Sequence, residues 1–346
     1  MNDYALLQLS DMDCTSNGEF EMTTSDSANT FFENGNLIIK PTLQDESLID
    51  NNNVINLLGN GCTSDSYWNC VTSTNTTNGT IVNPVKSARI NTKKGAQIKF
   101  GRVEVEAKLP AGDWLWPAIW MLPTDSVYGE WPASGEIDLM ESRGNNYTYT
   151  TGGNNVVHQT THWGPNGQLD KDSVTTAGTQ ALHSTFADGF HTFGLQWTGK
   201  PIFSSYYMQS CVQEADTLSE KYLFTYVDTR IRQILYQKFD KPQWDVGHFP
   251  PTYPNGTATV DPWTNGTNAA PFDQNFYLIL NLAVGGTNGW FMDGVGGKPW
   301  TDGSDIAKLQ FWEARNQWLP TWKNGGQMEI KSVKMWQKSG YNGCNA

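Results

Sequence analysis

Short runs of β-type residues recur along most of the chain, and they limit the possible folds more than any other feature. Several runs alternate apolar and polar residues, the period of a half-buried strand, and Gly, Asn and Asp punctuate them. The clearest runs are residues 36–40, 97–109, 190–197, 222–227, 233–239, 276–284 and 328–336. Helical periodicity is scarce, and residues 305–318 are the best candidate for one short helix. We therefore expect an all-β fold with two antiparallel sheets packed as a sandwich.

The chain shows no internal boundary. A length of 346 residues suggests two domains as a first guess, but large all-β folds often keep 200 or more residues in one. No Pro/Ser tract, charge block or internal repeat divides the sequence, so we expect a single domain over residues 1–346. Residues 61–82, rich in Asn, Thr, Ser and Gly, predict a long loop or a disordered segment, and residues 200–220 predict an insertion.

Composition argues against several classes of protein. The 15 Trp, 13 Tyr and 15 Phe carry too much apolar surface for a disordered chain. The 23 Lys and Arg face 35 Asp and Glu, and no basic run occurs, which argues against nucleic-acid binding. No stretch of about 18 uncharged apolar residues appears, and the net charge of −12 would be repelled by anionic lipid. We therefore expect neither a nucleic-acid nor a membrane partner.

Sequons and cysteines favour secretion, although the first 13 residues show no basic and apolar leader pattern. Five N-x-S/T sequons occur, at Asn75, Asn78, Asn146, Asn255 and Asn265. Cys62 and Cys70 lie eight residues apart, a natural spacing for a local disulfide in an oxidising compartment. Cys14 and Cys344 would suit a bond between the termini, which leaves Cys211 unpaired, and five buried thiols are the alternative. We expect an extracellular protein whose signal peptide is not in this chain.

Three carboxylates within six residues mark the candidate site. Residues 135–142 read GEIDLMES, and in a regular strand Glu136 and Asp138 share one face while Glu141 points to the other. A β-bulge near residues 139–140 would return Glu141 to the face of the other two acids. A solvated edge strand is the alternative.

A row of acids on one face suits glycoside hydrolysis. That chemistry needs one carboxyl group as nucleophile or base and a second as proton donor. The charge of the middle Asp138 would raise the proton affinity of its neighbours, so that one acid stays protonated while another is ionised. The residue spacing permits a retaining mechanism without establishing it.

Aromatic residues surround the acids in the sequence. Sugar rings have apolar faces that stack on exposed indoles, and although each single Trp is more readily explained by the core, the cluster as a whole favours a sugar-binding groove. The nearby tryptophans are Trp114, Trp116, Trp120, Trp131 and Trp163. His162 follows the acids by about one hairpin and would pair across to them, with a structural histidine as the alternative. EF-hand, HExxH, GxSxG, dinucleotide and P-loop patterns are all absent from the sequence.

The stretch 135–145 (GEIDLMESRGN) resembles the signature of glycoside hydrolase family 16 in its bulged E-x-D-x-x-E form, which is associated with laminarinase-like endo-β-1,3-glucanases. Further blocks resemble family blocks in the same order, and the resemblance covers roughly residues 20–338. They are residues 101–110, 116–123, 190–197, 276–286 and 311–322. The last block and ESRGN are similar to a subgroup of animal β-1,3-glucanases, glucan-recognition proteins and fungal relatives.

The resemblance implies a β-jelly-roll sandwich of two curved antiparallel sheets, with a substrate groove across the concave sheet. It also implies that Glu136 is the nucleophile, Glu141 the acid/base and Asp138 the assisting carboxylate of a retaining reaction. The matching blocks supply the groove candidates Arg102, Trp116, Trp120, Trp131, His162 and Asn281. Many relatives bind calcium through an Asp near the start of the final strand. Residues 329–333 (EIKSV) contain no Asp, so we expect no metal and no other cofactor.

The leading hypothesis is a secreted, monomeric retaining endo-hydrolase of β-1,3-glucan such as laminarin, with 1,3-1,4-linked or 1,6-branched glucans as related substrates. A transglycosylase, which uses the same acids, is the first alternative. A non-catalytic β-glucan-recognition protein on the same fold is the second. A binding protein does not need both glutamates, and this chain has Glu136, Asp138 and Glu141.

Overall fold

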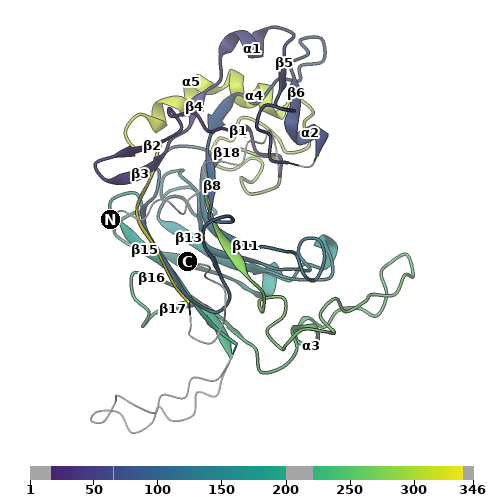
Figure 1. Ribbon diagram of the computed structural model, residues 1–346. Helices are drawn as coiled ribbons and strands as arrows, with labels where there is room; N and C mark the ends of the chain where they lie inside the picture. The colour runs from purple at the N-terminus through teal and green to yellow at the C-terminus, as the bar shows by residue number, and fades with distance from the viewer. Residues whose placement is uncertain (1–16, 65, 200–220, 338–346) are drawn as a thin grey trace.

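The computed structural model describes residues 17–64, 66–199 and 221–337, and its main feature is a pair of large antiparallel sheets packed face to face (Figure 1). We call them the cleft sheet and the back sheet. The cleft sheet contains, in spatial order, β14 (Thr176–Gln180), β13 (Val156–His162), β12 (Glu136–Ser142), β11 (Leu115–Pro123), β18 (Phe276–Val284) and β8 (Arg89–Asn91), with β9 (Gln97–Ile98) also paired to β18. The back sheet contains β17 (Gln233–Lys238), β16 (Tyr222–Val227), β15 (His191–Thr198), β10 (Gly101–Lys108), β19 (Met328–Gln337), β3 (Asn36–Ile39) and β2 (Thr30–Glu33).

Most of the smaller elements gather at one end of the sandwich, at the top of Figure 1, whereas the helix α3 lies near the bottom of that view. There β1 (Glu21–Thr23), β7 (Val85–Ser87) and β4 (Thr42–Leu43) form one small sheet, and β5 (Val54–Asn56) pairs with β6 (Val71–Ser73). The helices are short: α1 (Glu46–Asp50), α2 (Tyr67–Cys70), α3 (Gln243–Gly247), α4 (Ala307–Glu313) and α5 (Arg315–Trp318), with 3₁₀ turns η2 (Gly167–Leu169), η3 (Asp172–Val174) and η4 (Leu319–Trp322). None of the helices among the described residues has the length and apolar character needed to cross a bilayer.

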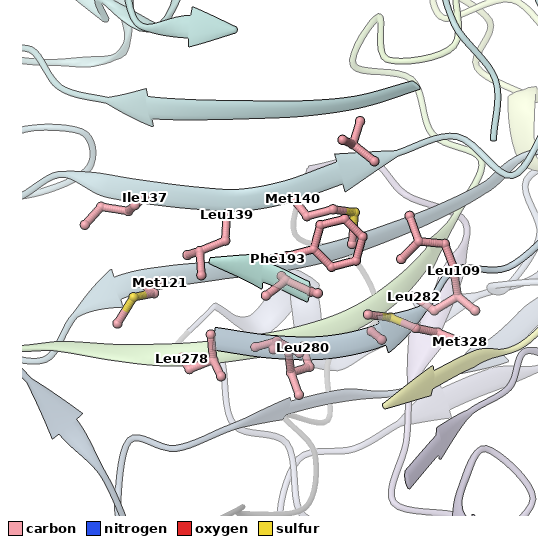
Figure 2. Close-up of a cluster of buried hydrophobic side chains, with 14 of the residues drawn as sticks. Leu109, Met121, Ile137, Leu139, Met140, Phe193, Leu278, Leu280, Leu282 and Met328 are labelled. Atoms are coloured by element: carbon pink, nitrogen blue, oxygen red, sulfur yellow. The ribbon is translucent and has the colours of Figure 1, made fainter. Parts of the chain in front are cut away.

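The core lies between the two large sheets and follows from the period of two along each strand. Leu278, Leu280 and Leu282 on β18 are fully buried, and they meet Phe193 of the back sheet in one apolar cluster (Figure 2). Burying a side chain of this size contributes about 1.5–3 kcal/mol. The residues between them, such as Asn281, point to the opposite face of the cleft sheet. Because side chains alternate along β18, every second residue packs in the core and the residues between them lie on the open face of the cleft sheet.

The predicted all-β sandwich is confirmed, and each of the seven predicted runs contains strand. The run 97–109 is interrupted, because Phe100 and Gly101 adopt positive φ angles of 58° and 144°. A Cβ atom on Gly101 would lie 2.1 Å from the backbone oxygen of Trp336, so glycine is required at this corner. The interruption sends β9 to the cleft sheet and β10 to the back sheet.

Two expectations about local structure need correction. The helix predicted at residues 305–318 is divided at Ala314, where φ −82° and ψ 8° leave the helical region, into α4 and α5. The segment 61–82 is not simply a loop, because it contains α2 and β6 and a bridge between Asn75 and Thr80. The polar composition of this segment gave no sign of a strand, but β6 forms backbone hydrogen bonds with β5.

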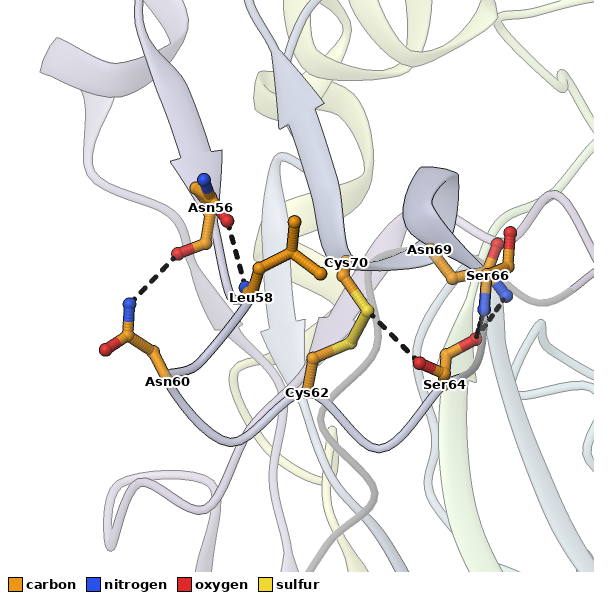
Figure 3. The surroundings of a disulfide bond; sticks show 8 residues. All are labelled: Asn56, Leu58, Asn60, Cys62, Ser64, Ser66, Asn69 and Cys70. Atoms are coloured by element: carbon orange, nitrogen blue, oxygen red, sulfur yellow. Dashed lines mark hydrogen bonds between the residues drawn. A yellow bond between two sulfur atoms is a disulfide. The ribbon is translucent and has the colours of Figure 1, made fainter.

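The predicted disulfide between Cys62 and Cys70 is confirmed, and it closes the turn that precedes β6 (Figure 3). Residues Cys14, Cys211 and Cys344, and the insertion expected at residues 200–220, lie outside the described residues.

Candidate active site

A β-bulge in β12 brings the three acids to one face. Asp138 and Glu141 are three residues apart, but their partners on β13, Thr160 and His158, are only two apart. The extra residue is absorbed at Leu139 and Met140, which are both fully buried in the core. Glu141 consequently returns to the face that carries Glu136 and Asp138, as the sequence predicted.

The acids form part of the floor of a cleft of about 900 Å³ on the open face of the cleft sheet. Five of the six groove candidates also line this cleft: Trp116, Trp120, Trp131, His162 and Asn281. Trp131 is 50% exposed, so its ring is accessible to a ligand. Trp114 and Trp163, by contrast, are buried in the core.

Arg102 is the exception, and its assignment to the groove has to be corrected. It lies on β10, which pairs with β15 and β19 in the back sheet. Its guanidinium group stacks on Trp336 at 3.8 Å from the ring centroid, and its Nε lies 3.6 Å from Glu104 Oε1. A sequence block can match a family without indicating which sheet the strand joins.

Indole N–H groups hold both glutamates. Trp131 Nε1 donates to Glu136 Oε2 at 2.7 Å, and Trp116 Nε1 donates to Glu141 Oε1 at 3.0 Å. Each bond fixes one carboxyl group and leaves its other oxygen for a ligand. The third indole, of Trp120, donates instead to Asn281 Oδ1 at 2.6 Å.

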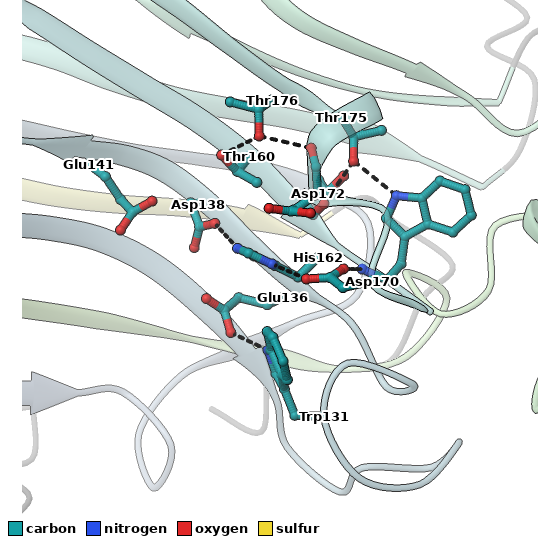
Figure 4. Close-up of polar contacts among 12 residues, drawn as sticks. Trp131, Glu136, Asp138, Glu141, Thr160, His162, Asp170, Asp172, Thr175 and Thr176 are labelled. Atoms are coloured by element: carbon teal, nitrogen blue, oxygen red, sulfur yellow. Dashed lines mark hydrogen bonds and ion pairs between the residues drawn. The ribbon is translucent and has the colours of Figure 1, made fainter. Parts of the chain in front are cut away.

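His162 lies between two aspartates, and this arrangement keeps it charged (Figure 4). Burial opposes its protonation, but contacts with Asp138 and Asp170 outweigh burial and raise the pKa of His162 to about 12. Its Nδ1 lies 2.6 Å from Asp170 Oδ2, and its Nε2 lies 3.4 Å from Asp138 Oδ2. Asp170 is itself fixed by the backbone N–H of Trp163 at 2.9 Å. The imidazolium therefore supplies a fixed positive charge beside Asp138.

Burial and the charge of Asp138 set the proton affinity of the glutamates. Burial first, and then Asp138, raise the pKa of Glu141 to about 8, against the smaller opposing effects of His162, Trp116 and Arg143. The same two causes raise the pKa of Glu136 well above its ordinary value, opposed by His162 and Trp131. A state in which Glu141 is protonated and Glu136 is ionised would provide both a proton donor and a nucleophile.

Two groups of side chains bring potential metal ligands within 4.8 Å of one another: Glu136, Asp138 and His162, and also His162, Asp170 and Asp172. Both groups include His162. An imidazole protonated on both nitrogens has no free lone pair for a metal ion. A metal ion bound through His162 would therefore have to displace a proton that the contacts with Asp138 and Asp170 favour.

Sequence reasoning missed three residues of the cleft wall beside Glu141. Trp290 stacks on Trp116 with centroids 4.7 Å apart and planes 11° from parallel. The guanidinium group of Arg143 lies over the Trp290 ring, 4.0 Å from its centroid. The ring of His158 meets Trp290 edge-on at 5.8 Å. Together they hold the Trp116 indole against Glu141. Trp290 lies on a loop more than 140 residues from Glu141, and the only available signal was its position shortly after the matched block 276–286.

The bond from Trp116 to Glu141 predicts a pH effect. The indole N–H favours the ionised carboxylate, so Trp116→Phe should raise the pKa of Glu141. If Glu141 acts as a proton donor, activity is lost as pH rises through its pKa, and the substitution should move the basic limb of the kcat/KM profile upward by about 0.5–1 pH unit. Trp120→Phe is the matched control, because that indole bonds Asn281 and no acid. An unchanged basic limb in Trp116→Phe would contradict this role of the indole.

Comparisons with known proteins agree with this geometry. Residues 61–233 match the family described as Glycosyl hydrolases family 16. The chain is 38% identical over 336 residues to a β-1,3-glucan-binding protein of Penaeus monodon, covering 93% of this chain and 83% of that protein. It is 33% identical over 211 residues to a glucan endo-1,3-β-glucosidase of Cryptopygus antarcticus, covering 60% of this chain and 59% of that enzyme. It is 37% identical over 200 residues to glucan endo-1,3-β-glucosidase A1 of Niallia circulans, covering 58% of this chain but only 22% of that enzyme.

Solved structures share the fold. The laminarinase from Rhodothermus marinus superposes with a TM-score of 0.53 at 22% identity, covering 97% of this chain and 91% of that one. A non-specific endo-β-1,3(4)-glucanase of family 16 gives a TM-score of 0.55 at 22% identity, covering 97% and 86%. The jelly-roll form of the sandwich that the sequence predicted is confirmed by this likeness.

Proposed function

The chain belongs to glycosyl hydrolase family 16, and on that basis we propose that it is a retaining endo-hydrolase of β-1,3-glucan. The observation that carries the proposal is the row of Glu136, Asp138 and Glu141 on the floor of one open cleft. The substrate class is supported by the relatives, which include a β-1,3-glucan-binding protein and a glucan endo-1,3-β-glucosidase. Accessible indoles along the cleft suit the apolar faces of glucose rings.

The proposed reaction proceeds in two displacements. In the first, the Glu136 carboxylate attacks the anomeric carbon, the glycosidic C–O bond breaks, and Glu141 donates its proton to the departing oxygen. In the second, the Glu141 carboxylate takes a proton from water, the water oxygen attacks the same carbon, and Glu136 leaves. Two inversions give overall retention of the β configuration.

Asp138 and His162 serve this cycle without forming a bond to the sugar. The charge of Asp138 raises the pKa of both glutamates, so that a proton is available to Glu141 near neutral pH. The imidazolium of His162, 3.4 Å from Asp138, limits this effect and favours an ionised Glu136. Trp131 favours the same ionised form through its N–H group.

The alternative functions differ in what happens after or instead of the first displacement. A glucan-binding protein without turnover is favoured by the name of the relative from Penaeus monodon, which is 38% identical. The presence of all three acids in this chain favours turnover. A transglycosylase would pass the glycosyl group to another sugar in place of water.

Incubation with laminarin, followed by chromatography of the products, tests the proposal. Hydrolysis predicts new reducing ends and progressively shorter oligosaccharides of intermediate length. Products longer than the substrate would instead support transfer as the main reaction, and an unchanged substrate that binds to the protein would support the glucan-binding alternative. Parallel reactions with 1,3-1,4-linked and 1,6-branched glucans would determine the linkage preference.

We further propose that the protein acts outside the cell as a monomer with no cofactor. The Cys62–Cys70 disulfide supports an oxidising compartment. All five sequon asparagines are exposed, as attachment of a glycan in a secretory pathway requires.

A further inference from the structure

We infer that the glucan chain has a second contact on this protein, on a pair of exposed aromatic rings beside a second cavity next to the cleft. We call Tyr67 and Trp68 of α2 the aromatic shelf. The inference rests on the proposed glucan substrate and deepens it, because it predicts binding by glucose units distant from the point of cleavage.

The exposure of the aromatic shelf is unusual. Trp68 is 77% exposed and Tyr67 is 53% exposed, whereas large aromatic side chains are mostly buried in folded proteins. The two rings meet edge to face with centroids 5.2 Å apart, so each retains an open apolar face. Exposed aromatic faces of this kind mark binding surfaces, and sugar rings are suited to stack on them.

The aromatic shelf is held in place before any ligand binds. A four-residue helix such as α2 is too short to be stable alone. Here the Cys62–Cys70 disulfide closes the segment, the buried Cys70 ends the helix, and Asn69 Nδ2 donates to Ser64 Oγ at 3.1 Å (Figure 3). A surface ordered in advance loses little conformational entropy on binding. The disulfide thus helps to order the segment that carries the two exposed rings.

The second cavity, of about 620 Å³, shares a wall with the cleft. Asn17 and Glu19 line the cleft, while Gly18 between them lines the second cavity. On the facing segment, Asn288 lines the cleft and Thr287 lines the second cavity. The two segments are in close contact, since a Cβ atom on Gly18 would lie 2.5 Å from Thr287 Oγ1. A glucan chain that leaves the cleft over this rim therefore arrives at the aromatic shelf.

The remaining lining suits the edges of sugars. Thr72 offers a hydroxyl group and Asp305 a carboxylate, beside the apolar Val54. The Thr80 hydroxyl donates to Asn78 Oδ1 at 2.9 Å and can accept a further hydrogen bond, and Lys308 Nζ, which donates to Asn83 Oδ1 at 3.3 Å, carries two further N–H groups. Such groups match the hydroxyls around a glucose ring while the aromatic shelf takes its face. The sequons Asn75 and Asn78 lie in the hairpin that carries Thr80, so an attached N-glycan is a competing occupant. Protein made in a bacterial periplasm forms the disulfide without that glycan.

Calorimetry on a variant without turnover tests the inference. In a Glu136→Gln parent, Trp68→Ala should weaken binding of laminarin by about tenfold, because one stacked sugar contact is lost. Binding of laminaritriose should stay unchanged, because we expect three glucose units to occupy the cleft beside the acids without reaching the aromatic shelf. Trp68→Phe keeps an aromatic face and should retain most of the affinity. Phe32→Ala, which removes a 57% exposed ring from β2 of the back sheet, is the matched control.

The outcomes separate the two proposals. Equal affinities of the parent and Trp68→Ala for laminarin would overturn the aromatic shelf and leave the proposed function intact. Equal losses for laminarin and laminaritriose would also overturn it, because they would indicate a general disturbance of the cleft. A parent and a wild-type protein that bind neither glucan would overturn the proposed function and this inference together.

Discussion

Glu136→Gln and Glu141→Gln should each lower the turnover of β-1,3-glucan by up to about 10⁴-fold. Each substitution keeps the shape of the side chain and a hydrogen-bond acceptor for the indole of Trp131 or Trp116. Each removes the group that attacks carbon or donates the proton, so the loss should fall on kcat. Binding of oligosaccharides should be retained. Initial rates on laminarin and calorimetric affinities measure the two quantities.

Glu313→Gln, an exposed position at the end of α4, is the matched control and should keep full activity. The two roles can also be told apart. With an aryl β-glucoside substrate and added azide, Glu136→Ala should give the α-glycosyl azide, because azide enters from the side that Glu136 vacates. Glu141→Ala should give the β-glycosyl azide, because azide replaces water in the second displacement. Activity close to wild type in either Gln variant would contradict the assignment of these acids.

Asp138→Asn should have the second largest effect, a loss of about 10²-fold or more in kcat. The amide keeps the size of the side chain but removes the charge that raises the pKa of Glu136 and Glu141. The pKa of Glu141 should therefore fall, and the basic limb of the pH profile should move to lower pH. The pKa of His162 should fall as well, because one of its two carboxylate partners is gone.

Kinetics over pH 4–10 and NMR titration of the His162 ring measure these changes. Asp125→Asn, an exposed position on the loop between β11 and β12, is the matched control and should alter neither. A lower kcat with an unmoved basic limb would mean that Asp138 acts by holding the strand in place and not by its charge.

The acid row was predictable because it depends on local rules. The period of two along a strand, corrected by one bulge at Leu139 and Met140, is enough to place Glu136, Asp138 and Glu141 on one face. The same rule places Trp116, Trp120 and Asn281 on the cleft side of their strands. His162 was predictable because β13 follows β12 in the chain and pairs with it as a hairpin, which places His162 opposite Glu136.

The rest of the site depends on packing between distant segments, which no local rule encodes. Trp290 reaches Trp116 from a loop, and Asp170 reaches His162 from the turn after β13. Arg102 was misplaced because alternation along a strand does not indicate which sheet the strand joins. Similarly, the polar composition of residues 61–82 did not indicate α2 and β6. These elements are stabilised by the disulfide and by pairing with β5, which are contacts between separate parts of the chain.

The central claim is that Glu136 and Glu141 cleave β-1,3-glucan with retention, and proton NMR of the first products tests it most directly. When the protein is mixed with laminarin, the signal of the β-anomer should appear first at the new reducing ends, and the α-anomer should grow only later by mutarotation. An initial α-anomer would contradict the two-step mechanism. The absence of any new reducing end would contradict the assignment of hydrolysis itself.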